Sequence, residues 1–151
     1  MNHIKYLGKF IQQNENIFIT CGYLCKKNEL IINIPINEWN VICIINEENT
    51  KSSITIQTNK FSMKDSKINI YKDYFRCYAI FSDINFFTSG HLNSSMNEII
   101  DTDPEIDYYL DKENPFTFVS VPQGWSEGNI YKYYNIDTGE ITAVQINFGD
   151  I

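Results

Sequence analysis

Basic residues are scarce in this sequence, and so are the residue types that most often carry catalysis. The chain has one arginine, Arg76, and two histidines, His3 and His91, and 12 basic side chains stand against 19 acidic ones, for a net charge of -7. Nucleic acids and anionic membranes carry the same sign of charge as this chain, so we expect neither as a partner. The expected partner is basic or neutral.

Long apolar runs and alanine are scarce as well. The N-terminal residues lack the continuous apolar stretch of a secretory signal, and no run is long enough to span a bilayer, so we expect a cytoplasmic protein. Alanine occurs only at Ala79 and Ala143, whereas isoleucine recurs throughout. Because β-branched side chains favour strands over helices, strands should predominate. A chain of 151 residues predicts a single domain, 1–151, with its own core.

Cysteine is present but not in a metal-binding pattern. Cys21, Cys25, Cys43 and Cys77 each lie in an apolar stretch, where a reduced thiol behaves as a small buried hydrophobe. A structural zinc site needs closely spaced pairs, and only Cys21 and Cys25 are near each other in the sequence. We therefore predict buried, reduced thiols, no metal site and no cofactor.

The spacing of apolar residues predicts an α+β fold that is mainly an antiparallel β-sheet. Ile4, Leu7 and Phe10 recur at helical spacing, so residues 2–14 are expected to form an N-terminal helix. Two short helices are expected around residues 91–112, and the second is expected to start at Asp103-Pro104, a pair typical of helix N-termini.

Alternating apolar and polar residues predict the strands. Three pairs of segments are expected to form hairpins: 17–21 with 30–36, 39–45 with 53–58, and 129–135 with 140–148. Separate strands are expected at 68–71, 74–81 and 116–121. The glycine-flanked segment 122–129, which contains Trp125, is predicted to be a loop.

An acidic stretch is the first candidate site. Its carboxylates are Asp101, Asp103, Glu105, Asp107, Asp111 and Glu113, and Tyr108 lies among them as a possible exposed anchor. An EF-hand loop is excluded, because Ile106 replaces the required glycine and Lys112 the bidentate glutamate. Two interpretations remain: a solvated helix start that suits the helix dipole, or a face that accepts lysine and arginine side chains of a basic protein.

Two further candidates stay open. Ser89 and His91, with Asp83 or Asp101 to orient the ring, could form a hydrolase site, although no nucleophile-elbow motif is present and a helix-capping serine is the simpler interpretation. Trp125 either folds back on the core or stands exposed as an anchor for a partner.

In size, in acidity, in the stretch 101–113 and in the Trp125 loop, the chain resembles the immunity proteins with which bacteria neutralise their own toxins. The resemblance is to the class as a whole. It implies a non-enzymatic, single-domain inhibitor of a cognate toxin, often a basic nuclease, that binds through an acidic and aromatic surface. The main alternative is a β-barrel or sandwich that holds a small apolar ligand, and a hydrolase is the other.

Overall fold

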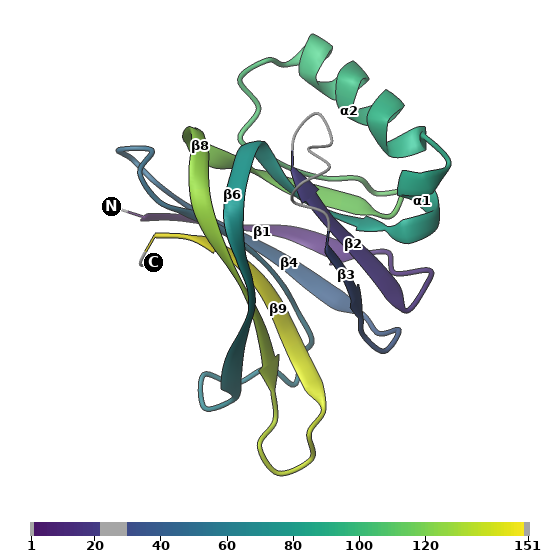
Figure 1. Cartoon of the computed structure of the whole chain (residues 1–151), viewed down its shortest axis with the longest axis vertical. Helices are drawn as coiled ribbons and strands as arrows, with labels where there is room; N and C mark the ends of the chain where they lie inside the picture. Colours follow the sequence, from purple (N-terminus) through teal and green to yellow (C-terminus); the bar gives the residue numbers. More distant parts are fainter. Residues whose placement is uncertain (1, 22–29, 150–151) are drawn as a thin grey trace.

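A computed structural model describes residues 2–21 and 30–149 as one strongly curved antiparallel sheet with two helices on one side (Figure 1). The sheet order is β1-β4-β5-β9-β8-β6-β2-β3, and β7 pairs with β8 beside this path. The strands are β1 (Asn2–Phe10), β2 (Asn16–Cys21), β3 (Leu30–Asn33), β4 (Trp39–Asn46), β5 (Ser52–Gln57), β6 (Ser66–Asp83), β7 (Tyr108–Leu110), β8 (Phe116–Tyr134) and β9 (Ile141–Phe148). The helices are α1 (Ile84–Thr88) and α2 (His91–Thr102).

The two long strands β6 and β8 allow the sheet to fold over on itself. Their pairing is interrupted between Arg76 and Tyr78, where Cys77 has a φ of 65° and, on β8, Gln123 and Gly124 have φ values of 57° and 78°. Such bulges bend a strand and increase its twist. On one side of the bend β8 pairs with β9, and on the other β6 pairs with β2, so we call these parts the β9 half and the β2 half.

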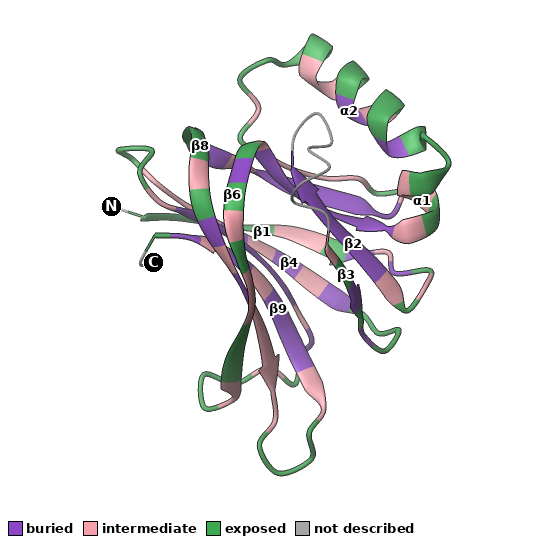
Figure 2. Cartoon of the chain, viewed as in Figure 1, coloured by how far each residue is buried: buried purple, intermediate pink, exposed green. Residues whose placement is uncertain are grey.

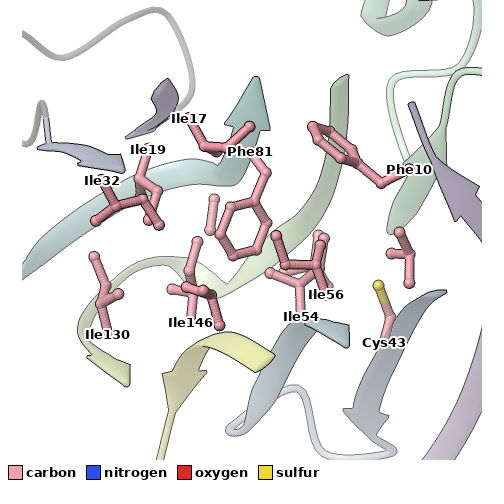
Figure 3. Close-up of a cluster of buried hydrophobic side chains, with 14 of the residues drawn as sticks. Phe10, Ile17, Ile19, Ile32, Cys43, Ile54, Ile56, Phe81, Ile130 and Ile146 are labelled. Carbon is pink, nitrogen blue, oxygen red and sulfur yellow. The ribbon is translucent and has the colours of Figure 1, made fainter. Parts of the chain in front are cut away.

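The main core fills the space between the two halves. Ile54 and Ile56 from β5 and Ile146 from β9 lie near Ile19 from β2 and Phe81 from β6 (Figure 3). All five side chains are buried, and burying a side chain of this size contributes about 1.5–3 kcal/mol. Figure 2 shows buried positions along β2 and β9. Apolar packing between distant segments therefore determines the curvature.

A second core lies on the other face of the β2 half, beneath the helices. Ile80 and Phe118 from the sheet pack with Leu92 and Met96 from α2. Asp83 starts α1, because its Oδ1 accepts hydrogen bonds from the backbone N–H groups of Asn85 and Phe86. Among the described residues, no helix has both the length and the apolar character needed to cross a membrane.

Much of the predicted pattern is confirmed. Every strand pair is antiparallel, and the three predicted hairpins correspond to β2 with β3, β4 with β5, and β8 with β9. The first of the two helices predicted around residues 91–112 corresponds to α2. The segments 68–71 and 74–81, predicted as two strands, are parts of the single strand β6.

The predicted N-terminal helix over residues 2–14 is wrong, because residues 2–10 form strand β1. This strand pairs with β4, and a bulge shifts the register between Tyr6 and Gly8, where Gly8 has a φ of 124°. The bulge moves later side chains to the other face, so Leu7 and Phe10 both contact the core. The bulged strand therefore reproduces the three-residue spacing of Leu7 and Phe10, whereas Ile4, before the bulge, is exposed.

The second predicted helix is wrong as well. α2 ends at Thr102, and Asp103 Oδ1 accepts a hydrogen bond from the Glu105 backbone N–H at 3.2 Å, which forms a turn in place of a helix start. Residues 108–110 then form β7 on the edge of β8. The rings of Tyr109 and Phe118 stack with 5.6 Å between their centroids, so tertiary packing favours a strand at residues 108–110.

Candidate functional site

The acidic stretch runs from the last turn of α2 through a turn to β7. Asp101 lies in the last turn of α2 and Asp103 caps the helix end, where its backbone N–H donates to the carbonyl of Ile99 at 2.9 Å. The C-terminus of a helix carries partial negative charge, and α2 has no basic residue in its last turn. The carboxylates therefore lie at the unfavourable end of the dipole, the reverse of the predicted helix-start arrangement.

A hollow of about 380 Å³ lies between α2 and β7, and we call it the acidic hollow. Ile99, Ile106 and Tyr109 supply its apolar lining. Its carboxylates come from Glu98, Asp103 and Asp111, and its neutral polar lining from Ser95, Thr102 and Asn114. An apolar wall with several carboxylates suits the aliphatic stem and cationic head of a lysine or arginine side chain.

The acidic hollow has a negative electrostatic environment. The Tyr109 hydroxyl donates a hydrogen bond to Asp111 Oδ2 at 3.1 Å. Burial raises the pKa of Tyr109, and the negative charges of Asp111 and Glu98 raise it further. The ion pairs among the described residues join His3, Lys9, Lys60 and Lys72 to glutamates elsewhere, so in this part of the molecule no ion pair neutralises the carboxylates of residues 98–113.

A second hollow, of about 300 Å³, connects the acidic stretch to the bend in the sheet, and we call it the bulge hollow. Glu105 and Asp107 line it from the turn after α2, and Cys77 and Gly124 line it from the bulges of β6 and β8. Ile106 lines both this hollow and the acidic hollow. The fold therefore makes one continuous surface from the two hollows.

Trp125 lies next to the bulge hollow, and its predicted loop is wrong: β8 continues through residues 122–129. The side chain is 58% exposed and does not fold back on the core. Arg76 pairs with Trp125 in register, and its guanidinium lies 4.9 Å from the indole centroid. Tyr74, 54% exposed, approaches the same ring edge-on at 6.1 Å. Tyr74, Arg76 and Trp125 form what we call the aromatic triad.

The remaining predicted residues are placed less favourably for one site. Asp101 is exposed on α2 and does not line either hollow, and Glu113 lines a different depression with Lys112 beyond β7. Tyr108 is half-buried and packs against the main core, so the prediction of an exposed anchor is wrong for this residue. Asp103, Glu105, Asp107, Asp111 and Trp125 are the predicted residues that line or border the two hollows.

The serine and histidine pair does not form a hydrogen-bonded dyad among the described residues. The Ser89 hydroxyl donates to the Phe86 carbonyl at 2.9 Å and accepts from the backbone N–H of His91 at 3.4 Å. The exposed His91 ring contacts the ring of Phe86, with centroids 5.9 Å apart. Asp83 is buried, and its Oδ1 caps α1. These contacts hold the turn between the helices.

The described cysteines lie on strands. Cys21 and Cys43 are buried, and burial raises the pKa of the Cys43 thiol. Cys77 is partly exposed at the bend, and Cys25 lies outside the described residues. Within residues 2–21 and 30–149, no group of three or more histidine, cysteine or acidic side chains is arranged to hold a metal ion.

Glu98, Ile99 and Tyr109 belong to the acidic hollow but are missing from the site predicted from sequence. The helical spacing of Leu92, Met96 and Ile99 predicts that Ile99 lies on the inner face of α2. Glu98 precedes Ile99 directly, so this spacing is the sequence signal that could have pointed to both residues. The position of Tyr109 depends on the pairing of β7 with β8, which has no local sequence signal.

Comparisons of this chain with protein-family models, with curated proteins and with solved structures found no match.

Proposed function

We propose that this chain is an inhibitor of the immunity-protein class, which binds a basic toxin by taking lysine or arginine side chains into the acidic hollow. The main support is the uncompensated charge at the end of α2. Asp103 lies at the end of α2, where the helix dipole is negative, and Glu98 lies just before the last turn; both line the acidic hollow beside apolar residues and have no ion-pair partner among the described residues. A cation from a partner would relieve the repulsion between these carboxylates and the negative end of the helix. The apolar lining would remove water from one side of that cation.

The aromatic triad supports a protein partner over a small cation. Tryptophan, tyrosine and arginine are the residue types most enriched among interface residues that dominate binding energy. Trp125 and Tyr74 are each more than half exposed, and Trp125 follows Gly124 at the border of the bulge hollow. The proposed interface therefore has an acidic part that speeds encounter and an aromatic part that slows release.

The test is a matched charge-reversal experiment. One variant carries Glu98→Lys and Glu105→Lys, which change one carboxylate in each hollow. The control carries Glu48→Lys and Asp137→Lys, which make the same change in total charge in two exposed turns. Proteins of the native organism are captured on wild-type protein and on both variants, and each captured basic protein is expressed alone and with the chain to score growth inhibition.

We expect a basic protein that arrests growth when expressed alone, is neutralised by the wild-type chain and by the control, and escapes the Glu98→Lys, Glu105→Lys variant. Salt should weaken the complex, because exposed charges are screened. Equal neutralisation by both variants would show that the interface lies outside the two hollows. Circular dichroism and thermal unfolding of each variant confirm that the fold is intact.

A further inference from the structure

A separate polar hollow lies on the outer face of the β9 half, where β8 pairs with β9. Its volume is about 410 Å³, within the usual range of small-molecule sites. The lining consists of side chains or backbone from Thr50, Lys67, Ser126, Glu127, Asn129, Tyr131, Asn147 and Gly149. It shares no lining residue with the acidic hollow or the bulge hollow, and it lies beside the aromatic triad, because its Glu127 pairs in register with Tyr74.

One residue that lines this hollow has a buried polar atom without a hydrogen-bond partner among the described residues. It is Asn147, whose Nδ2 donates to Gln145 Oε1 at 3.3 Å while its Oδ1 is unpartnered. A buried acceptor without a donor costs about 1–3 kcal/mol. The Asn147 amide therefore favours a ligand that donates hydrogen bonds.

The charge of the lining is balanced. Lys67 is its one cation and Glu127 its one carboxylate, and Glu127 is already paired with Lys72 at 3.1 Å. An anion such as phosphate offers few hydrogens to the unpaired Asn147 oxygen and would meet the Glu127 carboxylate. A divalent cation needs several oxygen ligands, usually more than one carboxylate. A neutral ligand with many hydroxyl groups satisfies both the acceptors and the amide donors.

An aromatic wall completes the hollow. Tyr131 lies on β8, and the Lys67 ammonium is 4.5 Å from its ring centroid. Asn129, two residues earlier on β8, accepts a hydrogen bond from Asn69 Nδ2 at 2.8 Å. Because the Lys67 ammonium lies over its ring, Tyr131 would bind a sugar through its hydroxyl, while the amides bind other hydroxyl groups of the sugar. We propose that this hollow is a binding site for a neutral saccharide, with Asn129, Tyr131 and Asn147 as its main contacts.

The test is a titration of the isotope-labelled full chain, monitored by backbone amide shifts. The probes are glucose, galactose, mannose, N-acetylglucosamine and cellobiose, each up to about 10 mM, so that millimolar binding is detected. At least one sugar should shift the amides around the hollow. Asn129→Ala should weaken that binding about tenfold, the effect of losing one or two hydrogen bonds. Asn97→Ala, an exposed asparagine on α2, should not change it.

Glu127→Gln provides a second variant, because this partly exposed side chain can change without opening the core. It should alter sugar affinity and leave the fold intact. The proposal is overturned if none of the five sugars shifts these amides, if inorganic phosphate binds there in their place, or if Asn129→Ala and Asn97→Ala bind the sugar equally.

Discussion

Arg76 lies over the indole ring of Trp125, its partner in the pairing of β6 with β8, with 4.9 Å between the guanidinium carbon and the ring centroid. The chain has no other arginine, and it is placed beside one of only two tryptophans, at the point where the sheet bends. A guanidinium over an indole is held by charge–quadrupole attraction. We expect the contact to hold the exposed ring in one orientation.

The first prediction is that Arg76 and Trp125 are energetically coupled. A double-mutant cycle with Arg76→Ala and Trp125→Ala should give a coupling of about 0.5–1 kcal/mol in the free energy of unfolding, as for cation–π pairs at exposed sites. Urea unfolding measures it. Arg76→Ala with Tyr133→Ala is the control, because Tyr133 lies eight residues further along β8, and this pair should be additive. A coupling below the error of the control cycle would show that the contact does not fix the ring.

The second prediction concerns Gly128, where β8 passes over the main core. A Cβ atom at this position would lie 2.6 Å from Cε1 of Phe148 and 3.0 Å from Cδ1 of Phe75. These rings pack edge-to-face at 5.4 Å and are both buried, so they have little room to move. Gly128→Ala should lower the free energy of unfolding by about 1–3 kcal/mol, as overpacking does.

The matched control for Gly128 is Gly90→Ala. Gly90 has no atom within 4 Å of the added methyl group, but its φ of 84° favours glycine. Its substitution should therefore cost about 1 kcal/mol through backbone strain alone. If the two variants prove equally stable, the crowding at Gly128 is relieved by small shifts of the rings.

Sequence patterns predict the parts of this fold that depend on near neighbours. The alternation in β4 and β5 and the turn at Asn135–Glu140 are local signals, and both hairpins are confirmed. The partner of β1 is β4, whose paired residues lie 29 to 44 positions later in the chain, and the bulge at Gly8 gives Leu7 and Phe10 the spacing of a helix. Distant pairing thus explains the failure at the N-terminus.

In the candidate site, too, the sequence predicts what depends on near neighbours and misses what depends on distant pairing. The carboxylates of residues 101–113 are visible in the sequence. The sequence does not show that a helix ends where this stretch begins. Asp103-Pro104 has the chemistry of a helix start, whereas the free edge of β8 binds Tyr108–Leu110 as a strand. Glu98 lies on α2, whose helical spacing is visible in the sequence, whereas the position of Tyr109 in the acidic hollow follows from that pairing alone.

The third prediction is that the acidic end of α2 lowers the stability of the free protein. Asp101→Asn removes one charge from the last turn with little change in helix propensity, so stability should rise by about 0.3–1 kcal/mol at low ionic strength. The gain should shrink as salt screens the dipole. Glu48→Gln, in an exposed turn, is the control and should not have this salt-dependent gain. A loss of stability in Asp101→Asn would mean that the carboxylate has a favourable partner.

The last prediction concerns alkaline pH. The pKa of Tyr109 is raised by burial and by the charges of Asp111 and Glu98. The phenol keeps its proton in the folded state at pH values where the unfolded chain, with a tyrosine pKa near 10, releases it. The contribution of Tyr109 is therefore fully present below about pH 10 and is lost as the pH rises through the folded pKa, because the unfolded state then binds fewer protons.

Tyr109→Phe tests this linkage. The variant loses the hydrogen bond to Asp111, so it should be less stable than wild type at pH 7, by about 0.5–1.5 kcal/mol. Its stability should then fall less steeply than that of wild type above pH 10, and the two urea-unfolding curves should approach each other. Tyr6→Phe is the control, since Tyr6 is exposed on β1 and its hydroxyl bonds the neutral amide of Asn40. Parallel pH profiles for wild type and Tyr109→Phe would show that Asp111 and Glu98 do not make the hollow negative enough to hold the proton, and would remove one support for a cationic partner there.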